Sequence, residues 1–192
     1  MERKVLNMAH ESIAFTWGST SAERAMVFPC DRYLSHPDAV CFRAIDVQAP
    51  AHRLFQWLCQ LRVAPYSYDW IDNRGCQSPR HLSPELEQLA VGQPVLSIFR
   101  LAEFEPDRHL TIVMASPWAI TTFGEIAGSY VIVPRTPQQC RLVAKLLVRY
   151  PRKSPWSLMR WWLPWGDLVM MRKQFFTLKQ LAEGHPSSSS LL

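Results

Sequence analysis

The chain has 192 residues and a mass of 22.2 kDa, enough for one domain that buries about 70% of its unfolded surface. Apolar residues make up 48% of the chain and charged residues 19%, a balance that excludes an intrinsically disordered body. With only seven glycines, collagen-like repeats and glycine-rich phosphate-binding loops have little support. The composition therefore predicts an aromatic-rich globular domain.

The net charge of +5 and the sequence pI of about 9.1 favour acidic partners. The excess lies near the C-terminus, because ten basic residues between Arg135 and Glu183 stand against only Asp167 and Glu183. Nucleic-acid binding is not expected, since no helix-turn-helix, zinc-finger or ribonucleoprotein motif accompanies these charges. An anionic membrane surface is the better electrostatic partner.

The cysteines and histidines indicate neither a disulfide framework nor a metal site. The five cysteines are odd in number and widely spaced, and they form no C-x-x-C pair, so reduced thiols are expected. Neither H-E-x-x-H nor G-x-S-x-G occurs, which leaves metallohydrolases and serine hydrolases without support. The N-terminus leads into no apolar signal core, and the uncharged run 110–124 is broken by Pro117 and too short to span a bilayer. We therefore expect a cytoplasmic protein. Its location could include peripheral contact with the inner membrane surface.

The first part of the chain predicts an arm followed by a strand and a helix. Residues 1–39 mix polar and aromatic side chains with two prolines, as expected of an irregular arm packed on the domain. Residues 40–47 read as a strand whose apolar face Arg43 interrupts near an edge. Helical spacing then runs from Leu54 to Leu61, with Pro50 suited to the first turn.

Two shorter features precede the sheet. Residues 66–75 concentrate polar and aromatic side chains and end in turn-forming residues, so a loop or distorted turn is expected. The run Ser83-Pro84-Glu85 opens like a capped helix, and a second short helix is predicted to end near Gly92.

The remainder predicts an antiparallel meander and a final helix. The last strand, 141–150, alternates an apolar face with a mostly basic one. Residues 166–183 repeat apolar side chains at spacings of three and four, so this helix should face the sheet. The other predicted strands are 95–104, 110–115, 120–126 and 130–133. The chain is therefore predicted to divide into an arm (1–39), one domain (40–184) and a flexible tail (185–192).

This order of elements, an α+β fold, resembles the helix-grip fold of the SRPBCC superfamily, which includes START domains, birch-pollen-allergen-like proteins and aromatic polyketide cyclases. The likeness spans roughly residues 40–183, and its most specific piece is the run Tyr66-Ser67-Tyr68-Asp69. It rests further on Ala49-Pro50, residues 57–61, 70–73 and 83–86, Val91-Gly92, residues 170–173 and residues 181–183.

The resemblance implies a curved antiparallel sheet wrapped around the C-terminal helix, with a cavity between them for a hydrophobic small molecule or lipid. No cofactor and no metal are implied. We expect the helix and the last strand to supply part of the cavity wall, and the loop after the first helix to supply the rest. The predicted cavity residues are Trp57, Tyr66, Tyr68, Asp69, Trp70, Leu146, Val148, Tyr150, Met171 and Phe175.

The same loop supports an enzymatic alternative. In a polyketide cyclase-like or dehydratase-like enzyme, Tyr66, Tyr68 and Asp69 would direct proton transfer in an apolar cavity. Against this stands a structural role, in which Asp69 caps backbone amides and the aromatic side chains cover the core. A third interpretation is a structural or regulatory protein with a closed pocket.

The run from Pro155 to Trp165 holds four tryptophans beside basic residues, a composition typical of a membrane-interface anchor. The alternative is a buried aromatic cluster that closes one end of the sheet, since Pro155 and Pro164 leave room for only a short amphipathic turn. The docking candidates are Trp156, Arg160, Trp161, Trp162 and Trp165.

Overall fold

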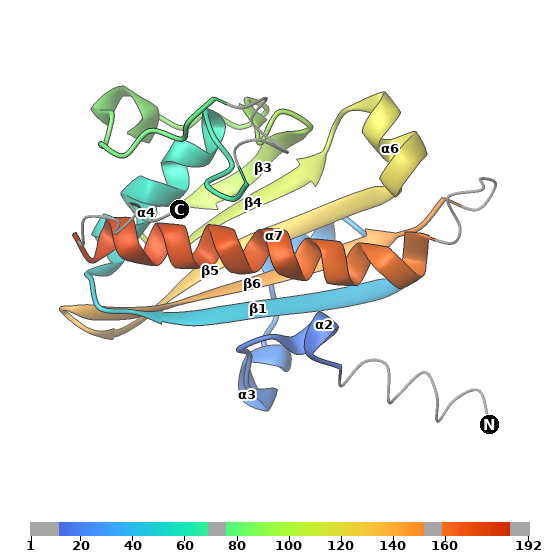
Figure 1. The fold of residues 1–192 in the computed structure, drawn as a ribbon, viewed down its shortest axis with the longest axis horizontal. Helices are drawn as coiled ribbons and strands as arrows, with labels where there is room; N and C mark the ends of the chain where they lie inside the picture. The colour runs from blue at the N-terminus through green and yellow to red at the C-terminus, as the bar shows by residue number, and fades with distance from the viewer. Residues whose placement is uncertain (1–11, 69–75, 152–158, 185–192) are drawn as a thin grey trace, which may run out of the picture.

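In the computed structural model, which describes residues 12–68, 76–151 and 159–184, the chain has the predicted helix-grip architecture. A six-stranded antiparallel sheet has the strand order β1-β6-β5-β4-β3-β2, and the long helix α7 lies along one face of it (Figure 1). The strands are β1 (Ala39–Val47), β2 (Pro94–Val95), β3 (Phe99–Glu105), β4 (His109–Met114), β5 (Glu125–Thr136) and β6 (Gln139–Arg149).

Five α-helices and three 3-10 helices surround this sheet in the described part of the chain. None of the described helices is long and apolar enough to cross a membrane. The α-helices are α2 (Ile13–Thr16), α3 (Ser21–Arg24), α4 (Ala51–Cys59), α6 (Pro117–Phe123) and α7 (Met159–Ala182), and the 3-10 helices are η1 (Pro29–Arg32), η2 (Gln60–Arg62) and η3 (Pro84–Glu87).

The main core lies between the sheet and the helices α4 and α7, on what we call the helix face of the sheet. Side chains alternate along each strand, so that Leu142 and Ala144 of β6 point to this face and pack against Phe175 and Leu178 of α7. The predicted apolar stripe of α7 is buried along its whole length, from Leu168 to Ala182. This burial orients the helix on the sheet.

The opposite side, which we call the arm face, is covered by residues 28–34, whereas α2 lies against the edge strand β1 and α7. Phe28 and Cys30 are buried against Phe42 and Leu147, in a second apolar cluster. The arm also reaches the sheet edge, where the amide of Ala44 in the edge strand β1 donates to the carbonyl of Trp17 at 3.0 Å. A Cβ atom at the next residue, Gly18, would lie 2.0 Å from the Ala44 carbonyl oxygen, so only glycine permits this approach.

Two of the predicted strands are wrong. The strand predicted at 95–104 is broken into β2 and β3, because Leu96 and Ser97 adopt positive φ angles of 51° and 62°. Residues 120–126 fall largely in the helix α6, which starts with Pro117 in its first turn and ends at Gly124, with a φ angle of 94°. The predicted strand 130–133 is the middle of the longer β5.

Two predicted helices differ in extent. The helix predicted from Ser83 to Gly92 is only the single 3-10 turn η3, and the Ser83 side chain makes no capping hydrogen bond. In contrast, α7 begins at Met159 instead of Gly166 and contains Pro164. The tryptophan-rich segment from residue 159 onward is therefore helical and continuous with α7, and not a separate short turn.

Candidate functional site: a cavity of two chambers between the sheet and α7

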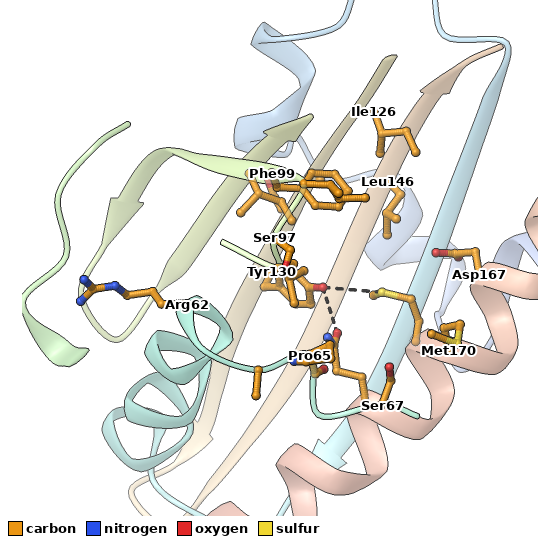
Figure 2. A pocket seen from close by; sticks show the side chains of 18 of the residues that line it. Arg62, Pro65, Ser67, Ser97, Phe99, Ile126, Tyr130, Leu146, Asp167 and Met170 are labelled. Atoms are coloured by element: carbon orange, nitrogen blue, oxygen red, sulfur yellow. Dashed lines mark hydrogen bonds between the residues drawn. The ribbon is translucent and has the colours of Figure 1, made fainter. Parts of the chain in front are cut away.

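The inner chamber, of about 240 Å³, lies between the middle of the sheet and α7. Figure 2 shows side chains from the segment after α4, from the β2–β3 turn, from β5 and β6 and from α7 converging on it. Both apolar and hydrogen-bonding groups line it. They include Pro65, Ser67, Ser97, Phe99, Ile112, Tyr130, Leu146, Asp167, Met170, Met171 and Gln174.

The outer chamber, of about 780 Å³, adjoins the inner one toward the start of α7. The two chambers share lining residues, among them Phe99, Ile126, Leu146 and Met170, so they are adjacent parts of the space between the sheet and α7. Aliphatic, aromatic and sulfur-containing side chains make up nearly all of its wall. They are Cys41, Ile98, Phe99, Met114, Phe123, Ile126, Leu146, Val148, Tyr150, Trp162, Leu163, Pro164, Trp165, Val169 and Met170, with Asp167 as the charged exception.

A glycine in β5 leaves room for the inner chamber. Gly128 lies between Ile126 and Tyr130 on the helix face, where the strand alternation calls for a side chain. A Cβ atom there would lie 3.5 Å from Cγ of Leu146 and 3.9 Å from Cγ1 of Ile112. Any larger side chain at this position would therefore extend into the chamber.

Tyr130 and Gln174 form a hydrogen-bonded pair in the wall of the inner chamber. The Tyr130 hydroxyl donates to Oε1 of Gln174 at 2.9 Å and lies 3.6 Å from the Met171 sulfur (Figure 2). Nε2 of Gln174 in turn donates to the Pro65 carbonyl at 2.7 Å, which ties the segment after α4 to α7. Burial raises the pKa of Tyr130, so the phenol stays protonated throughout the neutral range.

Asp167 marks the boundary between the chambers, because it lines both. Its Oδ2 accepts a hydrogen bond of 2.6 Å from Arg43, a side chain that is 0% exposed on the helix face of β1. The guanidinium also donates to the carbonyls of Ala14 and Phe42, both at 2.8 Å. Burial raises the pKa of Asp167, and the charge of Arg43 opposes that increase. The arginine predicted to interrupt the first strand thus joins β1, the arm and α7.

Exposed aromatic side chains stand around the outer chamber. Trp162 and Trp165 line it and are 76% and 50% exposed, and Phe123 lines it from α6. Trp118, which is 60% exposed, packs edge-to-face on Phe123 with 6.1 Å between ring centroids. We call these four residues the aromatic rim. They come from α6 and from the start of α7, which lie at the same end of the molecule (Figure 1).

Of the predicted cavity residues, the structure places four in the cavity wall: Leu146, Val148, Tyr150 and Met171. Trp57, Tyr66 and Phe175 lie in the main core, exposed by 2%, 1% and 0%, and they line neither chamber. Tyr68 is half-buried and also lines neither chamber. Asp69 and Trp70 lie outside the described residues.

Of the docking candidates, Trp162 and Trp165 belong to the aromatic rim, and Arg160 is exposed at the start of α7. Trp156 and the side chain of Trp161 lie outside the described part of the structure. Sequence reasoning missed Gly128, Tyr130, Asp167 and Gln174. The alternation around β5 could have indicated the first two, whereas their meeting with α7 depends on the tertiary fold.

The thiol in the outer chamber is poorly suited to nucleophilic chemistry. Cys41 is 3% exposed, and burial raises its pKa to about 12, so the reactive thiolate is scarce at neutral pH. Within residues 12–68, 76–151 and 159–184, no group of three or more histidine, cysteine or acidic side chains could hold a metal ion.

Comparison with known proteins finds no matching family model and no matching curated protein. Solved structures resemble the chain remotely. A solution NMR structure of a protein from Thermobifida fusca is 13% identical and has a TM-score of 0.48 over 79% of this chain and 99% of that one. Likenesses at this level carry no argument about ligand or reaction.

Two further solved structures have titles that name a function. The di-domain ARO/CYC protein BexL of the BE-7585A biosynthetic pathway is 12% identical, with a TM-score of 0.46 over 75% of this chain and 46% of that one. Norcoclaurine synthase from Thalictrum flavum, in complex with a transition-state analogue, is 12% identical, with a TM-score of 0.46 over 77% of this chain and 96% of that one.

Proposed function

We propose that the protein binds a hydrophobic small molecule or lipid in the cavity between the sheet and α7. The observation that carries the proposal is the outer chamber of about 780 Å³, whose wall is nearly all apolar. This chamber adjoins a smaller one that has a few hydrogen-bonding groups. An apolar hollow with a few placed polar groups is the usual form of a small-molecule site. The helix-grip architecture agrees with this role, which is the one that the resemblance to the SRPBCC superfamily implies.

Native mass spectrometry of the purified protein, followed by organic extraction, tests the proposal directly. A co-purifying apolar molecule is expected, or uptake of one from a mixed lipid extract. Gly128→Leu should fill the inner chamber and weaken uptake by about tenfold or more, because its side chain would meet Leu146 and Ile112. Gln139→Leu, at the exposed start of β6, adds the same side chain outside the cavity and should leave uptake unchanged.

An apo protein that takes up nothing from the extract would overturn the proposal. So would a folded Gly128→Leu variant whose uptake equals that of the Gln139→Leu control.

The cavity geometry supports binding better than the cyclase-like or dehydratase-like alternative. That reaction relies on Tyr66, Tyr68 and Asp69, of which the first is a core residue and the second lines neither chamber. Tyr68→Phe combined with Asp69→Asn should therefore leave ligand affinity within a modest factor. A loss of turnover by about a hundredfold on any cyclised or dehydrated substrate would favour the enzyme instead.

We further propose that the aromatic rim docks on an anionic bilayer and opens the outer chamber toward the lipid. Two observations support the docking: Trp118, Trp162 and Trp165 are each at least half exposed, and the basic Arg160 is exposed beside them. Tryptophan together with arginine favours the interface between headgroups and hydrocarbon.

Co-sedimentation with phosphatidylcholine vesicles, with and without phosphatidylglycerol, tests the docking. Trp162→Ala with Trp165→Ala should weaken binding to the anionic vesicles by about tenfold or more, because buried apolar area drives interfacial binding. Val27→Ala removes a side chain that is 90% exposed in the arm and serves as the control. If the double variant binds the vesicles as well as the wild type does, the proposal that the aromatic rim is a docking surface is contradicted.

A further inference from the structure

We propose that the ligand is an amphiphile with an uncharged, hydroxyl-bearing polar end in the inner chamber and an apolar body in the outer chamber. This inference rests on the proposed function and narrows its ligand class. It follows from the division of the cavity into two chambers, from the hydrogen-bonding capacity left in the inner one, and from the charges around it.

The two chambers differ in both size and chemistry. The outer one, of about 780 Å³, offers aromatic and aliphatic side chains such as Trp165 and Val148. The inner one, of about 240 Å³, offers the phenol of Tyr130, the amide of Gln174 and the carboxylate of Asp167. A ligand with one small polar end and a larger apolar body fits both chambers. Its polar end then contacts the hydrogen-bonding groups of the inner chamber, and its apolar body contacts the apolar side chains of the outer one.

The hydrogen-bonding capacity left in the inner chamber is mixed. Tyr130 donates its only hydroxyl proton to Gln174, so its oxygen still accepts a hydrogen bond. Arg43 occupies Oδ2 of Asp167, and Oδ1 has no partner within the described part of the chain. Gln174 uses one of its two amide protons on Pro65 and keeps one to donate. A hydroxyl group, which both donates and accepts, can use acceptors and donor together.

The charges around the inner chamber disfavour an ionised polar end. The carboxylate of Asp167 points from α7 toward the chamber (Figure 2), but its pairing with Arg43 leaves no net charge there that would stabilise a carboxylate or phosphate. Arg62 also lines the chamber, but its guanidinium points away from the converging side chains (Figure 2), and Nη1 donates to the carbonyls of Leu86 and Gln88 at 3.3 and 3.2 Å. An ammonium group would meet an Asp167 that Arg43 already neutralises. Burying an unpaired charge is costly, so a neutral polar end fits best.

Competition among four compounds with the same chain tests the inference: n-dodecanol, its methyl ether, dodecanoate and dodecylammonium. For each compound, the measured quantity is the concentration that displaces the neutral probe Nile red from the intact protein. The alcohol should bind about tenfold more tightly than the ether and the two ions, which corresponds to roughly one buried hydrogen bond. If dodecanoate or dodecylammonium binds as tightly as dodecanol, the inference that the polar end is a neutral hydroxyl group is overturned. If Nile red does not bind and no compound raises the melting temperature, the proposed function itself fails.

Two tyrosines allow a matched pair of variants. Tyr130→Phe removes the phenol of the inner chamber, and Tyr150→Phe removes the one that lines the outer chamber. Tyr130→Phe should reduce the preference for dodecanol over its methyl ether toward unity, whereas Tyr150→Phe should preserve that preference. A folded Tyr130→Phe protein with the wild-type preference would overturn the placement of the polar end.

Should Tyr130→Phe fail to fold, Gln174→Glu keeps the test decisive. The new carboxylate lies within reach of the same polar end, so dodecylammonium should gain affinity and dodecanoate should lose it. Unchanged relative affinities for the two ions would place the polar end elsewhere and overturn the inference.

Discussion

The two faces of the sheet are built from the same strands, yet one is filled and the other is partly hollow. On the arm face, Phe28 packs on Phe42 and Leu147, and two ion pairs join the arm to β6. These pairs are Glu23 with Arg141, and Asp31 with Lys145 at 2.6 Å. On the helix face, the C-terminal half of α7 packs as tightly, with Phe175 and Leu178 fully buried, but its N-terminal half stands over the two chambers.

The difference shows what decides whether a sheet face becomes core or cavity. An irregular arm follows the sheet surface and brings side chains of fitting size to each gap. The regular helix α7 does not do so over its N-terminal half, and a glycine at position 128 in the facing strand removes a side chain that would fill the space. The cavity is therefore a consequence of a rigid cover over an incomplete strand face.

The largest effect is expected from breaking the ion pair that joins β1 to α7. Arg43→Met should lower the free energy of unfolding by about 3–5 kcal/mol, because it removes a fully buried guanidinium and leaves the Asp167 carboxylate, which is 22% exposed, without its partner. Urea denaturation measures the loss. Arg32→Met breaks an exposed pair with Glu103, in which the Arg32 side chain is 69% exposed, and should cost no more than about 1 kcal/mol. Equal losses for both variants would contradict the role of the buried pair.

Neighbouring leucines in β6 compare the two faces most directly. Leu147→Ala removes a 2% exposed side chain from the filled arm face and should cost about 2–5 kcal/mol of unfolding free energy. Leu146→Ala removes a half-buried side chain that lines both chambers, so fewer contacts are lost and the cost should be smaller by about 1–2 kcal/mol. If the two variants lose equal stability, the helix face is not hollow at this position.

Acid should weaken the attachment of the arm to β6 by protonating Glu23. Burial alone would raise the pKa of Glu23, but hydrogen bonds from Arg141 and the Thr20 amide outweigh it and hold the pKa below the usual 4.5. Ionised Glu23 therefore stabilises the fold fully above pH 4.5, and this contribution is lost as the pH falls through the lowered pKa of the folded state.

Glu23→Gln tests this assignment. Its unfolding free energy at pH 7 should be about 1–3 kcal/mol lower than that of the wild type, and the difference should shrink as the pH is lowered below 4.5. A constant difference down to pH 3 would show that the carboxylate charge is not what holds the arm.

The smallest effect concerns thiol labelling, which leaves stability unchanged. Burial raises the pKa of Cys30 to about 11 and that of Cys41 to about 12, so both should react with iodoacetamide more slowly than the exposed Cys76. Cys41 lines the outer chamber, and n-dodecanol should slow its labelling further, whereas Cys30 on the arm face should not respond. Peptide mass spectrometry distinguishes the sites, and equal protection of both thiols would contradict a ligand confined to the helix face.

Periodicity predicted the elements that bury a regular stripe. The alternation of β6, the helix α4 and the apolar face of α7 were all evident, because burial repeats with the period of the element. The residues of α6 were misjudged, since Ile120, Thr121 and Thr122 favour strands locally while Pro117 and Gly124 bound a helix.

The candidate site was only half predictable. The cavity wall on β6 follows from alternation, as Leu146 and Val148 illustrate. The polar groups of the inner chamber do not, because Tyr130 and Gln174 are 44 residues apart and meet only when α7 lies across β5. Sequence reasoning instead favoured Tyr66, whose polar and aromatic neighbours resemble a site, although its ring packs on Trp57 in the core.

The contact between the arm and β1 also restricts the addition of another strand at this edge of the sheet. An outer strand with unpaired amides and carbonyls is a template on which another chain can extend the sheet. Here the Trp17 carbonyl already takes the Ala44 amide, and Gly18 sits against the strand too closely for any other backbone to enter. The opposite outer strand, β2, has only two residues. A second molecule could add a strand to β1 at this position only after the contact of Trp17 and Gly18 with Ala44 had been broken.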